Sequence, residues 1–192
     1  MKRLILCSQS PRRIQIFKDL NLKFDLATPN VDETQLNLEE TLLYLKRISK
    51  SKVYNIAQNI QSPESTLISS DTIVTYENSI LHKPTNFKNA VEILSTLSGK
   101  IHYVHSSFYI LIISGQIEVF DYVTTKVYFK PWKLGDIEKY ILDYQPFDKA
   151  GSYGIQDSNG PVDKFEGSYT NVMGFPIRKF FKEYPLWKYF IE

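Results

Sequence analysis

Cysteine, glycine and histidine are scarce in this chain of 192 residues, which contains one, eight and three of them. The single cysteine, Cys7, excludes an intrachain disulfide and in practice a thiolate zinc site, and it fits a reducing compartment. His102 and His105 lie three residues apart in a predicted strand and therefore point to opposite faces. We do not expect them to share a metal, and we interpret both as structural or surface residues, like His82.

Long apolar runs and an excess of charge of one sign are also missing. The apolar run Leu4–Cys7 is far shorter than the roughly 7–15 residues of a secretory core segment. Phe108–Ile113 is far shorter than the roughly 20 residues needed to span a bilayer. The formal net charge of +2 gives no bulk attraction to nucleic acid or membranes. We therefore expect a soluble cytoplasmic protein with neither partner.

Several common signatures are absent as well. The sequence has no GxxxxGK[ST], GxGxxG, GxSxG or HExxH motif, which excludes a Walker-type nucleotide site and the familiar hydrolase and zinc-protease motifs. A basic helix face between Lys46 and Lys52 leaves nucleic-acid binding open as a weaker alternative. Those lysines are interleaved with an apolar stripe, which favours a solvated helix face.

Apolar and aromatic residues are plentiful, at 43% and 14%, so the chain can bury a core. Hydrophobic periodicity predicts alternating strands and helices, followed by a long hairpin hinged at Ser114-Gly115. Strands are expected at residues 3–7, 23–28, 66–76, 80–81, 101–114 and 116–130, helices from residue 11 and at 38–60, 87–97, 134–144 and 176–182, and a packed tail at 186–191. This order predicts a single domain over 1–192 of the α/β class, with a mixed, partly antiparallel, twisted sheet flanked by helices.

The stretch Cys7–Arg13, CSQSPRR, joins the first predicted strand to the first helix. Ser10 is a favoured N-cap and Pro11 a favoured first helical residue. A helix N-terminus offers unpaired N–H groups and the positive end of the helix dipole, and forked arginines suit phosphate oxygens. Two arginines in a first turn oppose the dipole, so either a bound phosphate or an ordinary solvated turn explains them.

Polar residues elsewhere are weaker signals by themselves. Asp71 interrupts an apolar strand, where a carboxylate is costly unless it is paired or bound to metal, so it is a metal ligand, a general base or a turn residue. Glu33, Lys52 and Lys83 are each ordinary when taken singly. The glycine-rich stretches after Asp148 are either tight turns or places where backbone approaches a ligand.

Together these pieces resemble the Maf family of nucleoside triphosphate pyrophosphatases, also called septum formation inhibitor proteins. The resemblance covers nearly the whole chain, and the motifs follow one another in the same order as in the family. Small departures are Cys7, where the family has alanine, and Ser69-Ser70, where it has Gly-Ala. The matching segments are Ser8–Arg13, Glu33, Lys52, Ser70–Thr72, Lys83-Pro84, Leu97–His102, Asp148–Gln156 and Gly167–Pro176.

The resemblance implies hydrolysis of a nucleoside triphosphate to the monophosphate and pyrophosphate, with a divalent cation, Mg²⁺ or Mn²⁺, as cofactor. It implies a homodimer and two lobes around a central cleft, as in the ITP pyrophosphatases. It makes Asp71 the proton acceptor and, with Glu33, a metal ligand. The phosphate-binding residues that it implies are Ser8, Arg13, Lys52 and Lys83.

Arg12, Thr72 and Gln156 match the branch of the family that acts on dTTP and UTP, so the resemblance favours these substrates and related modified pyrimidine nucleotides. Two alternatives stay open. The chain could be a nucleotide-sensing regulator of cell division without significant turnover. It could also hydrolyse purine nucleotides such as ITP.

Overall fold

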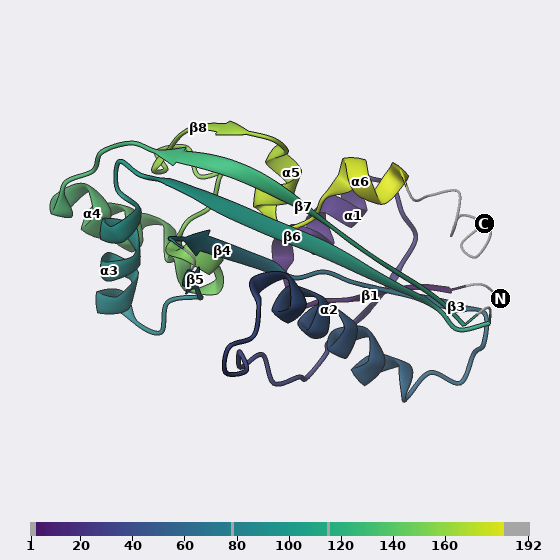
Figure 1. Cartoon of the computed structure of the whole chain (residues 1–192). Helices are drawn as coiled ribbons and strands as arrows, with labels where there is room; N and C mark the ends of the chain where they lie inside the picture. The colour runs from purple at the N-terminus through teal and green to yellow at the C-terminus, as the bar shows by residue number, and fades with distance from the viewer. Residues whose placement is uncertain (1–2, 78, 115, 183–192) are drawn as a thin grey trace. The chain divides into compact units, whose positions relative to one another are not determined.

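The computed structural model describes residues 3–77, 79–114 and 116–182 (Figure 1). The chain divides into two compact units, each built from separate stretches of sequence. The first contains the residues up to Asp71, Ser106–Val123 and those from Gly174 onward. The second contains Thr72–His105 and Thr124–Met173.

The first unit is a mixed sheet with helices on both faces. Its elements are β1 (Arg3–Cys7), α1 (Pro11–Asp19), β2 (Asp25–Ala27), α2 (Thr41–Ala57), β3 (Ser65–Ser69), parts of β6 (Ile101–Ile112) and β7 (Ile117–Phe129), and α6 (Ile177–Lys182). β1 pairs in parallel with β2 and β3, whereas β3 pairs antiparallel with β6. Figure 1 shows α2 on one side of these strands and α1 and α6 on the other. The predicted mixed, partly antiparallel sheet flanked by helices is confirmed.

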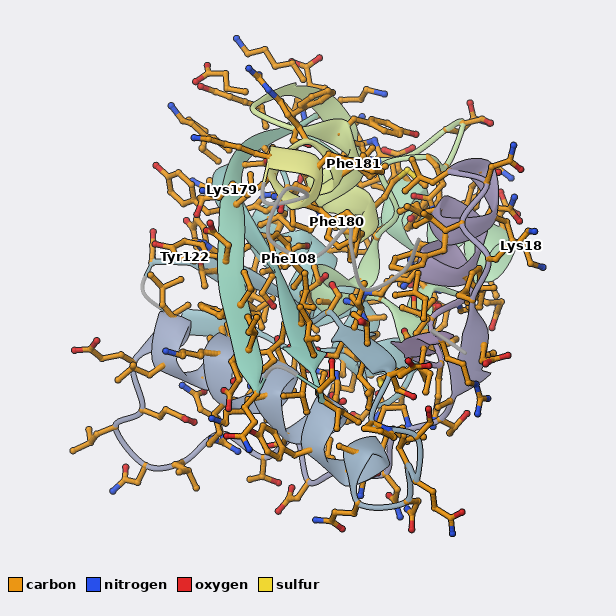
Figure 2. The ribbon with its side chains drawn as sticks, turned by 90° about the vertical axis from the view of Figure 1, so that its right-hand side faces the viewer. Lys18, Phe108, Tyr122, Lys179, Phe180 and Phe181 are labelled. Atoms are coloured by element: carbon orange, nitrogen blue, oxygen red, sulfur yellow. The ribbon has the colours of Figure 1, made fainter. Side chains whose placement is uncertain are left out.

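Alternating residues of the strands bury both faces of this sheet. Ile5 and Cys7 of β1 pack with Val53 of α2 on one face. On the other, aromatic rings gather under α1 and α6. The ring centroids of Phe108 and Phe180 lie 5.5 Å apart in an edge-to-face arrangement that adds to the apolar burial (Figure 2).

The second unit combines short strands with a pair of packed helices. Its elements are β4 (Thr72–Tyr76), β5 (Ser79–Leu81), α3 (Phe87–Leu97), α4 (Leu134–Tyr144), β8 (Val162–Glu166), α5 (Tyr169–Met173), two 3₁₀ turns (Pro146–Asp148 and Ala150–Ser152), and the remainders of β6 and β7. β4 pairs antiparallel with β5, and β7 with β8. The apolar faces of α3 and α4 share one buried cluster. β6 and β7 also pair, which confirms the predicted hairpin.

Three predicted elements differ from the structure. The single strand at 66–76 is wrong: β3 ends at Ser69 and β4 begins at Thr72, so Ser70 and Asp71 belong to neither. The helix predicted at 38–60 is shorter, because Leu38 is 94% exposed and has a left-handed backbone with φ 57°. The strand predicted at 23–28 is shorter in the structure, where β2 spans Asp25–Ala27. The predicted packed tail at 186–191 lies outside the described residues.

No helix in the part of the chain that the structure describes is long and apolar enough to cross a membrane. The single domain over residues 1–192 stays a prediction, since the chain divides into two compact units.

Candidate active site

The turn from β1 into α1 has the predicted form. Ser10 has the extended backbone of an N-cap, and Pro11 opens the helix, whose first turn contains no acidic residue. The buried Ser8 hydroxyl accepts a hydrogen bond from the Ser10 N–H at 3.1 Å. The turn is therefore fixed by its own serines, with the positive helix end beside two arginines.

The two arginines differ in burial. Arg12 is half-exposed, whereas Arg13 is buried and its Nε donates to the carbonyl oxygen of Gly174 at 2.8 Å. Burial lowers the pKa of Arg13, and the negative charge of Asp71 opposes that effect. The guanidinium of Arg13 is thus oriented by a residue 161 positions away in the sequence.

Lys52 joins the two acidic candidates. Its Nζ lies 2.6 Å from Oδ1 of Asp71 and 2.8 Å from Oε1 of Glu33. Lys52 projects from the buried face of α2, Asp71 follows β3, and Glu33 lies in the loop before α2. The side chains of Lys52 and Asp71 are 8% and 10% exposed, and that of Glu33 is 41% exposed. The structure therefore brings Asp71 together with Glu33 and Lys52, two residues that looked ordinary singly in the sequence.

The backbone of each acidic residue is held by a neighbouring group of the same unit. The hydroxyl of Tyr44 donates to the backbone carbonyl of Glu33 at 2.8 Å. Burial, with the charges of Asp71 and Glu33, raises the pKa of Tyr44 to about 12, so this hydroxyl keeps its proton at neutral pH. The N–H of Ser107 donates to the carbonyl oxygen of Asp71 at 3.0 Å. The backbones that carry both carboxylates are thus fixed.

A buried pair of hydroxyls links α2 to β6 beside Asp71. The Oγ atoms of Ser49 and Ser107 lie 2.6 Å apart, and Ser49 also donates to the carbonyl of Leu45 at 2.8 Å. Ser49 precedes Lys52 by three residues on the same helical face. This pair therefore fixes the helix that carries Lys52 against the strand that holds Asp71.

The acidic pair suits a divalent cation. In the described residues no group of three His, Cys, Asp or Glu side chains could hold a metal ion. Mg²⁺, however, is usually bound by one or two carboxylates together with substrate phosphates and water. Two carboxylates that already share one cation, Lys52, match that requirement, so the residues fit the metal.

The remaining predicted residues, Thr72, Lys83 and Gln156, belong to the second unit. Thr72 begins β4, whereas Lys83 and Gln156 are exposed. Lys52 and Asp71 belong to the first unit, so the meeting of these three residues with them stays a prediction.

Gln156 lies in a loop held by a buried ion pair within the second unit. The carboxylate of Asp157 accepts from Lys149 Nζ at 2.9 Å and from the Gly154 N–H at 3.1 Å. It also accepts from the hydroxyl of Tyr140, which extends from α4. Asp157, which follows Gln156 in the sequence, is therefore anchored to α4.

A protein-family model described as "Maf-like protein" matches residues 3–184. The chain belongs to the Maf family. A "dTTP/UTP pyrophosphatase" of Leptospira interrogans is 50% identical over 98% of this chain and 97% of its own length. One of Leptospira borgpetersenii is 46% identical over 98% of both chains. Among solved structures, a Staphylococcus aureus Ham1 protein is similar at 13% identity, with a TM-score of 0.49 over 69% of this chain and 74% of that one.

The departures from the Maf pattern have structural partners. Cys7 is buried in the core against α2, and burial raises the pKa of its thiol to about 12, so it stays protonated. Ser69 Oγ donates to the carbonyl of Ser49 at 2.6 Å, and Ser70 Oγ donates to that of Gly174 at 2.9 Å. The two serines therefore tie the end of β3 to α2 and to the segment that also orients Arg13.

Sequence reasoning missed Tyr44, Ser49 and Ser107 as supports of this Maf site. A signal exists for Ser49: a small polar residue interrupts the apolar stripe of α2 at helical spacing from Leu45 and Lys52. Ser107 has no such signal, because its role depends on a strand far along the chain from Asp71.

Proposed function

We propose that this Maf-family chain is a nucleoside triphosphate pyrophosphatase that converts dTTP and UTP to their monophosphates and pyrophosphate. The observation that carries the proposal is the convergence of Glu33 and Asp71 on Lys52 at a largely buried point. Buried charges are costly, and their concentration at one point is typical of a catalytic site. The names of the Leptospira relatives support the substrates.

The reaction replaces one bond to phosphorus by another. The oxygen of a water molecule bonds to the α-phosphorus, and the bond from that phosphorus to the bridging oxygen of the β-phosphate breaks. Pyrophosphate leaves with the electron pair, and the water proton passes to Asp71. A carboxylate whose backbone is fixed by Ser107 is suited to this task, because general-base catalysis depends on position as well as proton affinity.

Charge on the triphosphate is balanced by groups from several elements. In this proposal Ser8, Arg13, Lys52 and Lys83 bind phosphate oxygens, with the N-terminal end of α1 behind the first two. Glu33 and Asp71 would hold Mg²⁺ or Mn²⁺, which would supply positive charge beside the phosphate oxygens. Electrostatic stabilisation and positioning are the main contributions expected in phosphoryl chemistry.

Arg12, Thr72 and Gln156 select the base in this proposal. They match the dTTP/UTP branch of the family, and all three side chains can hydrogen-bond a pyrimidine edge. A site built to hydrogen-bond one base rejects another that leaves its polar groups unpaired.

The direct test is pyrophosphate release from dTTP, UTP, CTP, ITP, GTP and 7-methyl-GTP, with Mg²⁺, with Mn²⁺ and with a chelator. We expect metal-dependent turnover that is fastest on dTTP and UTP. Asp71→Asn should abolish it, whereas Asp25→Asn, which neutralises an exposed carboxylate of the same unit paired with Arg3, should not. Fastest turnover on ITP would instead favour the alternative that the protein hydrolyses purine nucleotides.

A nucleotide-sensing regulator is the competing function. Folded wild-type protein that binds dTTP or UTP but releases no pyrophosphate with any metal would overturn the enzyme proposal in its favour.

A further inference from the structure

Lys52 bridges the two carboxylates that would hold the metal in the proposed function. Its Nζ contacts Oδ1 of Asp71 at 2.6 Å and Oε1 of Glu33 at 2.8 Å, so one cation already bridges both carboxylates. Burial excludes most water from the contact between Lys52 and Asp71, whose side chains are 8% and 10% exposed, whereas that of Glu33 is 41% exposed. An ammonium and a divalent cation cannot share these two oxygens at such distances without strong repulsion.

A nearby lysine shows how different this arrangement is from a surface ion pair. Lys50 lies on the same helix and contacts Glu118 at 2.9 Å, but those side chains are 47% and 36% exposed. Such a pair is screened by water and contributes little. Lys52 and Asp71 are by contrast both largely out of water, and taking two charges out of water carries a desolvation cost.

We propose that Lys52 is a resident counter-cation that keeps divalent metal off Glu33 and Asp71 until a nucleotide arrives. The inference rests on the proposed function, in which these two carboxylates hold the metal. The phosphates of the incoming nucleotide offer the ammonium another anion, and the flexible four-carbon side chain of Lys52 turns to them. The metal would then enter together with the nucleotide, so that the negative charge of the two carboxylates is always balanced by either Lys52 or the metal.

The surroundings permit the side chain to move while the helix stays in place. Ser49, three residues before Lys52, is bonded to Ser107 of β6 and to the carbonyl of Leu45. Tyr44 holds the backbone of Glu33, and Ser107 that of Asp71. The Lys52 side chain can therefore change its partner while the backbones that carry Glu33 and Asp71 keep their places.

The test measures Mn²⁺ binding without nucleotide, by the electron paramagnetic resonance signal of free Mn²⁺. Lys52→Met removes the ammonium and should bind Mn²⁺ at least about tenfold more tightly than wild type, because a like charge a few ångströms away is gone. Lys50→Met is the matched control, since it removes the same charge from the same helix two residues away, and its affinity should equal that of wild type. Lys52→Arg keeps a cation and should bind Mn²⁺ as weakly as wild type.

Equal Mn²⁺ affinity of wild type and Lys52→Met, or an equal gain in Lys50→Met, would overturn the inference. Circular dichroism checks folding, and Lys52→Gln is the second neutral variant if Lys52→Met does not fold. Pyrophosphate release by wild type is measured separately. If wild type releases pyrophosphate but the neutral variants do not bind Mn²⁺ more tightly, only the inference about Lys52 is refuted. If wild type releases no pyrophosphate, the proposed function is refuted.

Discussion

At the scale of single residues, burial separates side chains that serve the proposed chemistry from those that serve folding. Lys52 and Asp71 are charged, buried and paired with one another. His102 is also completely buried, but its ring packs edge-on against Phe129 and its Nε2 lies 2.7 Å from the hydroxyl of Tyr153. The prediction that His102 is structural therefore has a physical basis in the second unit.

His102 should make the protein sensitive to acid. Burial lowers its pKa from 6.5 to about 3, so the folded state keeps it neutral where the unfolded chain binds a proton. The contribution to stability is complete above pH 6.5 and is lost as the pH falls toward 3, by up to about 1.4 kcal/mol per pH unit. Urea unfolding at pH 7 and pH 4.5 should show a smaller loss in His102→Gln than in wild type.

His105 is the control for that experiment. Burial also lowers its pKa, but it is less buried and bonds to Thr75 and Thr124 through its two ring nitrogens. If His105→Gln, rather than His102→Gln, flattens the acid dependence, the assignment to His102 is wrong.

At the scale of elements, the bounds of helices and strands are predicted best from the sequence where the hydrophobic period and the boundary signals agree. The bounds of α3 and α4 follow from apolar residues at helical spacing, with Asn86 as an N-cap that accepts from the Asn89 N–H. The break between β3 and β4 was not predictable, because apolar and β-branched residues flank it on both sides. It depends on Ser70 and Asp71 bonding to Gly174 and Ser107, which are distant in sequence.

The bond between Ser49 and Ser107 should couple α2 to β6. Ser49→Ala or Ser107→Ala leaves the other buried hydroxyl without this partner, and each should lower the unfolding free energy by about 1–3 kcal/mol. The double variant should lose less than the sum of the two, as measured by a double-mutant cycle in urea.

Ser65 provides the comparison for the serine pair. It is buried on β3, and its Oγ has no hydrogen-bond partner among the described residues. Ser65→Ala should be neutral or stabilising, because no bond is lost and a buried polar group is removed. Additive losses at Ser49 and Ser107 would contradict the coupling.

The loop that carries Gln156 should depend on Gly154. A Cβ at Gly154 would lie 2.7 Å from Oδ2 of Asp157, the oxygen that accepts from Lys149. Gly154→Ala should therefore lower the thermal unfolding midpoint. Gly135→Ala on α4 meets no atom within 4 Å and should be neutral or raise it, since alanine favours helix. A Gly154→Ala protein as stable as wild type would show that Asp157 does not hold this loop.

At the scale of the whole molecule, the unit boundary falls within the proposed set of site residues. Asp71 is the last residue of its stretch of the first unit, and Thr72 begins the second. The resemblance named these residues from sequence, but the partners that orient them come from other stretches, as Gly174 does for Arg13. Such long-range contacts cannot be predicted from local periodicity. The homodimer and the cytoplasmic location stay predictions.

In the proposed reaction, water attacks the α-phosphorus. The most direct test is to hydrolyse dTTP in water enriched in oxygen-18 and to analyse both products by mass spectrometry. We expect one labelled oxygen in the thymidine monophosphate and unlabelled pyrophosphate. Label in the pyrophosphate, or release of inorganic phosphate instead, would place the attack at another phosphorus and contradict the proposed reaction.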